Sequence, residues 1–299
     1  SSDCGSAYAV LLGTLGLGML PEVQNFNLAY IFYFVTLATV TIYIGAHRAL
    51  SVKQERIGLG QGILAPVLTS GALFGVYALL KYFPDFDLKT ILGLYFWILG
   101  TFAIAGNVTL PLQRWTALGE AKVNVALPQW LGVIDNETGE TLSAVDLCPA
   151  DGIAILLGVV LATLDFQKGH MDFTLNNLIA TFIAIDVFQL VGLQSFRTAA
   201  VLLSGLLLYD VFWVFGSSNV FGDNVMMTVA TSEAFTGPFR LLFPRIASLT
   251  AESSSSFPFS LLGLGDIAVP GLLVCLMLKL DGKVGQNLQG RAVAAGTAF

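Results

Sequence analysis

Seven long apolar runs dominate this chain of 299 residues, and each approaches the length that a helix needs to cross a bilayer. A spanning helix takes about 20 mainly apolar residues. Because the runs are continuous rather than alternating, a membrane β-barrel is disfavoured. We therefore predict an all-α, polytopic transmembrane helix bundle with spans at about 28–46, 62–82, 90–112, 151–166, 173–191, 197–216 and 259–280.

The scarcity of charge supports the same fold class. Only 11% of the residues are charged and 55% are hydrophobic, whereas a soluble domain carries about 25% charged residues. So few charges cannot cover a globular surface in water, which excludes a soluble enzyme, and the apolar content excludes a disordered chain. The net charge of −6 and the absence of a basic patch argue against a nucleic-acid partner.

The runs are expected to form one membrane-embedded domain over 1–299, with 217–258 as a loop between the last two spans. Apolar residues 7–20 are too short to span and fit either a signal-peptide core or a shortened helix. Nine Lys and Arg residues fall on one side of seven spans and five on the other. The first side is therefore expected to be cytosolic, with the start of the first span luminal and the C-terminus cytosolic. The glycosylation sequon at Asn136 should then carry no glycan.

Three aspartates, Asp186, Asp210 and Asp266, lie well inside apolar runs. A carboxylate at the bilayer centre costs about 3 kcal/mol on insertion scales, so such residues usually face a cavity or a partner. Asp210 and Asp266 lie on consecutive spans and can face each other, in which case they would share one proton. One carboxylate could then take a proton from water while the other donates a proton to a carbonyl oxygen.

The aspartates by themselves leave other functions open. Each can be a structural hydrogen-bonding group, and spacing alone favours a proton-coupled carrier that uses all three acids over a hydrolase. Among membrane proteases, the chain lacks the His-Glu-x-x-His pattern of a zinc enzyme, and neither histidine lies inside a span to activate a serine. If the chain cuts peptides in the bilayer, aspartate is the remaining route.

Three neighbours of the acids are candidate supporting residues. Gly263 and Gly265 precede Asp266 and are expected to let the seventh span approach its neighbour closely. Tyr209 is a candidate for orienting an acid, although adjacent residues point about 100° apart on a helix.

The segments around both acids resemble the GxGD intramembrane aspartyl proteases, in the signal peptide peptidase branch of the presenilin-like superfamily. The similar segments follow the family's order and are 208–216, 224–230, 238–244 and 262–271, within a resemblance that covers about 28–283. The resemblance implies an aspartic endopeptidase with Asp210 and Asp266 as its catalytic pair and no metal or organic cofactor. Its expected substrates are transmembrane peptides, namely remnant signal peptides and type II membrane segments in the endoplasmic reticulum. The other expected partner is the lipid bilayer, and a homo-oligomer remains an open alternative.

The resemblance also implies that the stretch after the sixth span positions the substrate. This role maps to 224–230, with Asn224, Val225, Met226 and Val229 as the candidates, and the β-branched residues are expected to pair with an unwound substrate strand. The family has nine spans and a Pro-Ala-Leu motif beside the acids, which this chain lacks. The alternative is therefore a truncated, catalytically impaired member that binds membrane segments without cutting them.

Overall fold

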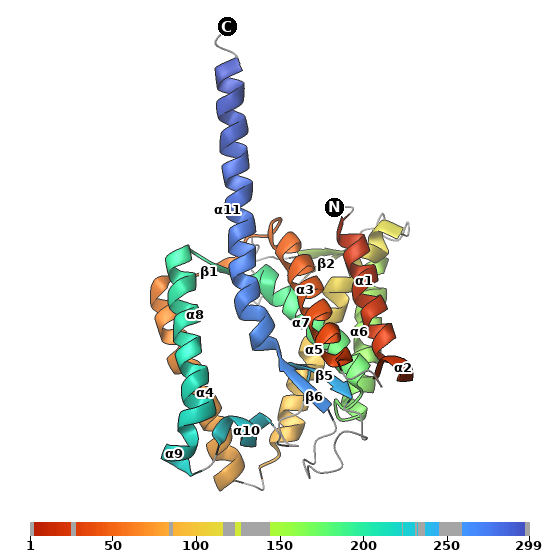
Figure 1. Cartoon of the computed structure of the whole chain (residues 1–299). Coiled ribbons are helices and arrows are strands. Elements are labelled where there is room, and N and C mark those ends of the chain that lie inside the picture. Colours follow the sequence, from red (N-terminus) through yellow and green to blue (C-terminus); the bar gives the residue numbers. More distant parts are fainter. Residues whose placement is uncertain are drawn as a thin grey trace. The chain divides into compact units, whose positions relative to one another are not determined.

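The computed structural model describes residues 3–24, 28–83, 86–115, 123–126, 144–222, 224–230, 232, 237–244 and 259–296 (Figure 1). In this part of the chain, six helical segments are long and apolar enough to cross a membrane. They coincide with the first six apolar runs, so the predicted class, a polytopic α-helical membrane bundle, is confirmed. The six are α3 (Ala29–Ala49), α4 (Leu59–Tyr82), α5 (Leu88–Trp115), α6 (Pro149–Gln167), α7 (Phe173–Leu190) and the continuous run of α8 (Phe196–Val211), η3 (Phe212–Gly216) and α9 (Ser217–Phe221).

Four further helices and three two-stranded sheets complete the described structure. The remaining helices are α1 (Asp3–Gly18), α2 (Pro21–Gln24), α10 (Val225–Ala230) and the long α11 (Leu264–Gly296). Strands β1 (Glu55–Ile57) and β4 (Val191–Leu193) pair in parallel. The antiparallel pairs are β2 (Val123–Ala126) with β3 (Ala144–Leu147), and β5 (Arg240–Pro244) with β6 (Phe259–Gly263).

The seventh apolar run differs from the predicted span of 259–280. Its first five residues form β6 because they pair with β5, and the Leu264 amide continues this pairing by donating to the Phe239 carbonyl at 2.9 Å. The helix therefore begins at Leu264 rather than near 259. The predicted loop 217–258 likewise contains α9, α10 and β5, while the sequon at Asn136 lies outside the described residues.

The expected single domain divides into two compact units. Unit 1 contains Ser1–Thr41, Pro84–Asp186 and Thr231–Leu264, and unit 2 contains Ile42–Phe83, Val187–Ala230 and Gly265–Phe299. In unit 1, α5 packs on α6, and the Trp97 indole donates to the Thr163 hydroxyl at 3.0 Å. In unit 2, α4 and α8 lie side by side.

Local side-chain chemistry explains where several of these helices begin. The Ser195 hydroxyl accepts the Thr198 amide at 3.2 Å before α8, and the Asp172 carboxylate accepts the Thr174 amide at 3.2 Å before α7. Both are N-cap bonds that satisfy amides left without a partner in the first helical turn. Pro149 occupies the first position of α6, where its missing N–H costs nothing.

Candidate active site

Asp210 lies one residue before the end of α8, on a helix that continues past it. Directly after Val211 the backbone widens into the π-helical turn η3, and α9 then resumes the α-helix. Single π turns inside α-helices are rare and are frequently found at functional sites. The Asp210 side chain is exposed, and Tyr209 beside it is half-buried.

Trp213 anchors this π turn within unit 2. Its side chain is buried, and its indole N–H donates to the Ser70 hydroxyl of α4 at 3.0 Å. Its ring stacks on Phe221 with 5.9 Å between centroids and lies 6.5 Å from Tyr209. The position of Asp210 therefore depends on an aromatic contact made one helical turn later.

The segment after α9 supports the same turn from the other side. The Asn224 amide donates to the Val214 carbonyl of η3 at 3.0 Å, and the Val225 amide donates to the Ser217 hydroxyl at 3.3 Å. In a π turn the backbone amides bond carbonyl groups five residues away instead of four, which leaves one carbonyl without an amide partner. A side-chain donor can satisfy that carbonyl. Asn224 therefore acts here as a support for the helix that carries Asp210.

The predicted pairing of 224–230 with a substrate strand stays a prediction. Val225–Ala230 form helix α10, with Val225 and Val229 buried and Met226 half-buried. The preference of valine for strands is weak and depends on context, and here burial of both valines on one side of a short helix outweighs it. In this structure the segment is therefore helical, and pairing with a substrate strand would require α10 to unwind.

Asp266 lies in the first turn of α11, three residues after the end of β6. Its side chain is exposed, and Gly263 pairs with Arg240 in the sheet. A Cβ added to Gly265 would meet no atom of the described residues within 4 Å, so among these residues the expected close packing is not seen at this glycine. Gly265 instead leaves open space directly beside Asp266.

The close approach of α11 occurs at Gly271. A Cβ on Gly271 or on Gly45 of α3 would overlap the ring of Phe188, which fills the space that the two glycines leave. Further along α11, the Lys279 ammonium donates to the Gln54 side chain at 2.6 Å, and Gln54 in turn donates to the Phe188 carbonyl. These contacts fix α11 within unit 2, the unit that also holds α8.

Two asparagines of α7 hold the sheet that precedes Asp266, and they were not among the predicted site residues. The Asn177 amide bonds both backbone groups of Leu242 at 2.7 Å each, and Asn176 donates to the Arg240 carbonyl at 2.8 Å. Leu241, Leu242 and Phe243 are buried. The available signal was an adjacent pair of carboxamides inside an otherwise apolar span, because a buried amide needs specific partners.

The third intramembrane acid, Asp186, takes part in a polar contact inside unit 1. It accepts a hydrogen bond from the Asn107 amide at 3.0 Å, and the Tyr8 hydroxyl donates to the Asn107 carbonyl oxygen at 2.8 Å. Asp186 therefore belongs to a network that joins α1, α5 and α7. It is assigned to the other unit from Asp210 and Asp266.

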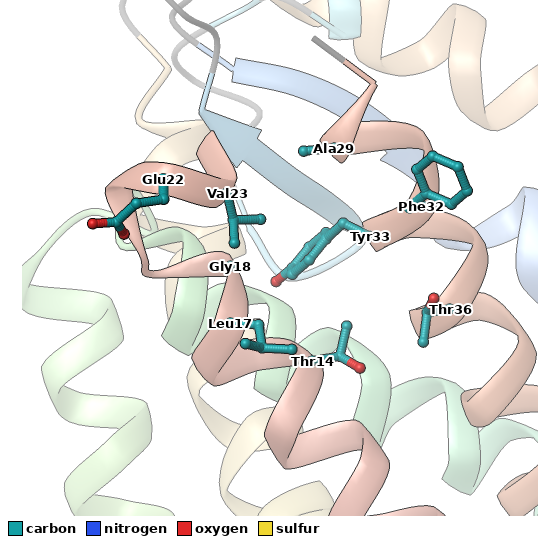
Figure 2. Close-up of a pocket in the computed structure, with 9 residues that line it drawn as sticks. All are labelled: Thr14, Leu17, Gly18, Glu22, Val23, Ala29, Phe32, Tyr33 and Thr36. Atoms are coloured by element: carbon teal, nitrogen blue, oxygen red, sulfur yellow. The ribbon is translucent and has the colours of Figure 1, made fainter. Parts of the chain in front are cut away.

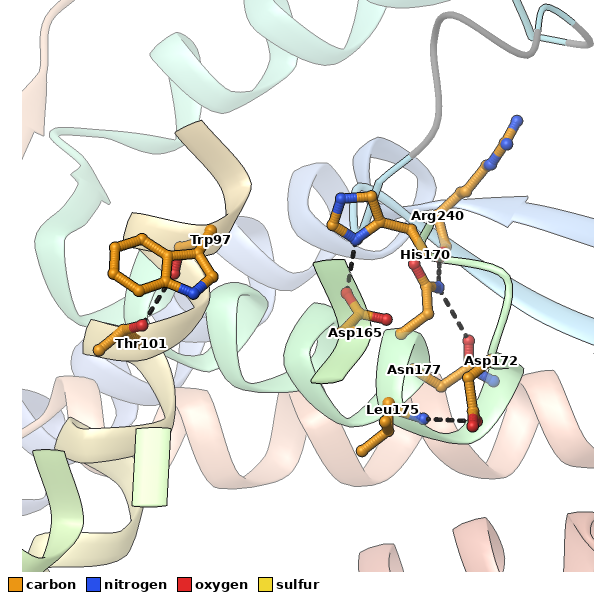
Figure 3. A network of polar contacts seen from close by, with 9 residues as sticks. Trp97, Thr101, Asp165, His170, Asp172, Leu175, Asn177 and Arg240 are labelled. Atoms are coloured by element: carbon orange, nitrogen blue, oxygen red, sulfur yellow. Dashed lines mark hydrogen bonds and ion pairs between the residues drawn. The ribbon is translucent and has the colours of Figure 1, made fainter. Parts of the chain in front are cut away.

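A buried ion-pair geometry closes the turn between α6 and α7. The Asp165 carboxylate lies 2.5 Å from the His170 ring nitrogen Nδ1, and His170 has a positive φ of 59° (Figure 3). Gly169 before it is also left-handed, which lets the chain reverse within a few residues. Both side chains are buried, so this pair organises the start of α7 and the asparagines that follow.

A cavity of about 490 Å³ lies among α1, α2 and α3 in unit 1 (Figure 2). Its carboxylate, Glu22, is exposed and points away from the hollow in this view. Neither Asp210 nor Asp266 lines it, so this cavity is separate from the candidate acids. Its lining residues are Thr14, Leu17, Gly18, Glu22, Val23, Ala29, Phe32, Tyr33 and Thr36.

Six apolar spans and two aspartates on different helices of one unit define a class, the polytopic membrane proteins with intramembrane acids. Comparison with known proteins identifies the family, within this class, to which the chain is similar. A model of the signal peptide peptidase family matches residues 50–294. The chain therefore belongs to the signal peptide peptidase family.

Individual relatives agree with this assignment. The chain is 27% identical to the signal peptide peptidase of Homo sapiens, over 84% of this chain and 65% of that protein. It is 38% identical to signal peptide peptidase-like 1 of Oryza sativa subsp. japonica over 43% of this chain and 40% of that protein. It is 33% identical to intramembrane protease 2 of Caenorhabditis elegans over 50% of this chain and 29% of that protein. No solved structure matches the chain.

Proposed function

We propose that this protein is an intramembrane aspartyl endopeptidase with Asp210 and Asp266 as its catalytic pair. The observation that carries the proposal is that both acids lie on helices of one unit in a member of the signal peptide peptidase family. Relatives named signal peptide peptidase and intramembrane protease support peptide bonds within membrane segments as the substrate class. Remnant signal peptides and type II membrane segments are the proposed substrates, in the endoplasmic reticulum.

The proposed reaction is hydrolysis by two carboxylates that share one proton. The ionised carboxylate takes a proton from water, whose oxygen attacks the peptide carbonyl carbon, while the protonated carboxylate donates to the carbonyl oxygen. The tetrahedral diol then breaks its C–N bond as the carboxyl that took the proton from water gives it to the leaving nitrogen, while the other, now ionised, carboxylate takes a proton from a diol hydroxyl and the C=O bond re-forms. The exposure of both side chains supports access of water and substrate to them.

The edge of β6 opposite β5 is the proposed binding place for the substrate backbone. An extended peptide can add a strand to a sheet edge, which unwinds a helical substrate and presents its carbonyl groups. Strand β6 ends three residues before Asp266, and the open space at Gly265 follows it in the chain. Tyr209 and Gly263 are proposed to support the acids, while Asn224, Val225 and Val229 act by stabilising the turn after Asp210.

The proposed topology has the start of the first span in the lumen and the C-terminus in the cytosol. The excess of basic residues on one side supports it. In cells, glycan attached at Asn136 would contradict this orientation, because that sequon is assigned to the cytosolic side.

Cleavage of a membrane peptide by the purified protein in detergent micelles tests the proposed function. The wild-type protein should cut a single-span peptide at an internal bond and be blocked by a transition-state analogue of aspartic proteases. Asp210→Ala and Asp266→Ala should each abolish cutting, whereas Asp186→Asn, outside the proposed pair, should retain it. Binding without cutting by the wild-type protein would favour the impaired family member, and proton-coupled solute flux that requires Asp186 would favour the carrier.

A further inference from the structure

Asn176 and Asn177 lie side by side in α7, and both are fully buried. The Asn177 carboxamide accepts the Leu242 N–H at 2.7 Å and donates to the Leu242 C=O at 2.7 Å. Its second N–H donates to the Tyr33 hydroxyl at 2.9 Å. A carboxamide has two donors and one acceptor oxygen, so every donor of Asn177 is used.

These bonds match the hydrogen bonds that the backbone of a neighbouring strand would form with β5. In an antiparallel ladder, the N–H and C=O of one residue point to the same side and bond a single partner residue. Asn177 bonds Leu242 in this two-bond manner, and Asn176 donates at 2.8 Å to Arg240, two residues earlier on the same edge. Figure 3 shows Asn177 and Arg240 in the same polar network. The two side chains therefore occupy the place of a third strand.

The opposite edge of β5 is occupied by β6. The Leu264 amide donates to the Phe239 carbonyl at 2.9 Å, and the register pairs Leu241 with Leu262. Because backbone groups alternate between the two edges, Leu262 faces β5 while Leu261 and Gly263 direct their backbone groups to the outer edge of β6. One side of the sheet is closed by asparagines, and the other ends at Gly263, beside the start of α11.

We propose that Asn176 and Asn177 are positioning residues that close the β5 edge and fix the register of the sheet, so that a substrate strand is added at the β6 edge. The inference rests on the proposed function and names the residues that set the register in which a substrate strand would lie along β6. Within the described residues this sheet has two strands. An unsatisfied sheet edge in an apolar environment recruits any available strand, so closing the β5 edge leaves the β6 edge for a substrate to extend. If the pairing of β5 with β6 slipped by one residue, every side chain of the slipped strand would turn to the opposite face of the sheet.

Three variants remove different sets of these asparagine bonds. Asn177→Leu keeps the branched shape but removes both bonds to Leu242. Asn176→Leu removes the bond to Arg240 and the longer bond, of 3.4 Å, to the Asn177 carbonyl oxygen. Tyr33→Phe is the matched control that leaves the bonds to the β5 backbone intact. Hydrogen exchange of peptides covering 239–244 and 259–264 in micelles reports on the sheet without reference to activity. We expect exchange to rise by about tenfold or more in Asn177→Leu, less in Asn176→Leu and little in Tyr33→Phe.

Cleavage products of a single-span peptide, identified by mass, report on positioning. A purely structural weakening would give less product from the same bond, whereas lost positioning should give cuts at neighbouring bonds and a fall in kcat larger than the change in KM. We expect the second pattern in Asn177→Leu, and in Asn176→Leu to a smaller extent. If Asn177→Leu does not fold, Asn176→Leu decides by the same two measurements.

Two results would overturn the proposal separately from the proposed function. Unchanged exchange in a folded Asn177→Leu protein would show that the carboxamide does not hold the sheet, whatever the activity. Raised exchange with cuts confined to the wild-type bond would remove the positioning role. A wild-type protein that cuts no membrane peptide would overturn the substrate part together with the proposed function, and the exchange data would still decide the assignment of the β5 edge.

Discussion

Asp210 lies within a helix that continues beyond it, whereas Asp266 lies in the first turn of a helix that follows a strand. The first acid is held by side chains packed around the π turn, chiefly Trp213 and Asn224. The second is preceded by a sheet whose backbone is bonded by Asn177. Two residues with the same proposed role therefore depend on different forces, aromatic packing in one case and backbone hydrogen bonding in the other.

The largest expected effect comes from replacing either aspartate, and it should be equal for the two although different contacts hold them. Asp210→Asn and Asp266→Asn should each lower cleavage by about 10³-fold or more, because an acid–base pair acts as a unit. The double variant should be no worse than either single one. The measurement is product formation from a single-span peptide at equal amounts of folded protein. Full activity in either single variant would exclude that residue from the pair.

The next effect concerns the packing around Asp210. Trp213→Ala should destabilise the fold by about 3 kcal/mol, because it removes a buried ring that contacts Phe221 and Tyr209. Trp213→Phe is the matched control, since it keeps a ring and loses the bond to Ser70, at a cost of about 1 kcal/mol. Thermal unfolding in detergent measures both. Equal stability of Trp213→Ala and the wild-type protein would show that the aromatic cluster does not hold the turn.

A smaller effect is expected on the helix that carries Asp266. Gly271→Ala should destabilise by about 2 kcal/mol because its methyl group would overlap the Phe188 ring. Gly265→Ala should leave stability nearly unchanged, since no atom lies within 4 Å of the added carbon, but should lower cleavage if the space beside Asp266 admits substrate. Adding Phe188→Leu to Gly271→Ala should recover part of the loss. If Phe188→Leu did not restore stability to the Gly271→Ala protein, overlap with the Phe188 ring would not be the cause of the loss.

The smallest effect lies at the start of α7, the helix that carries the two asparagines. Burial alone would raise the pKa of Asp172, but the Lys168 ammonium and the amides of Leu175 and Thr174 outweigh it and lower that pKa. Asp172→Ala should cost about 1 kcal/mol at pH 7 through the lost N-cap. The ion pair with Lys168 should add little, because solvent screens it.

The pH dependence of this last effect follows from the direction of the shift. A lowered pKa in the folded protein means that the contribution is present above the unfolded value of about 3.9 and is lost as pH falls through the folded value. The difference in stability between wild type and Asp172→Ala should therefore be constant from pH 7 to 5 and narrow in stronger acid. A gap that widens on acidification would contradict the assignment.

Hydropathy predicted the spans of this protein because each run is long, apolar and free of competing signals. The same reasoning failed at Phe259–Gly263, where an apolar run continues through a change from strand to helix. Nothing in composition marks that change, since β6 forms only because β5 lies beside it. Val225–Ala230 is helical for a related reason, since burial of Val225 and Val229 outweighs the preference of valine for strands.

Motifs located the two acids but not the residues that hold them. Asp210 and Asp266 stand out because charge is rare inside an apolar run. Asn177, Trp213 and Phe188 contact partners far away in the sequence, so their roles depend on tertiary structure that local patterns do not encode. The glycine pattern also misled, because the crowded position is Gly271 rather than Gly265.

The wide turn at Phe212–Gly216 has a practical consequence for anyone scanning this helix by substitution. A π turn holds about one residue more than an α turn, so it offsets the angular count by about 100°. A helical wheel drawn at a uniform 3.6 residues per turn through 196–221 would therefore assign residues after the turn to the wrong stripe. Lipid-facing and protein-facing positions need to be counted separately upstream of Phe212 and downstream of Gly216.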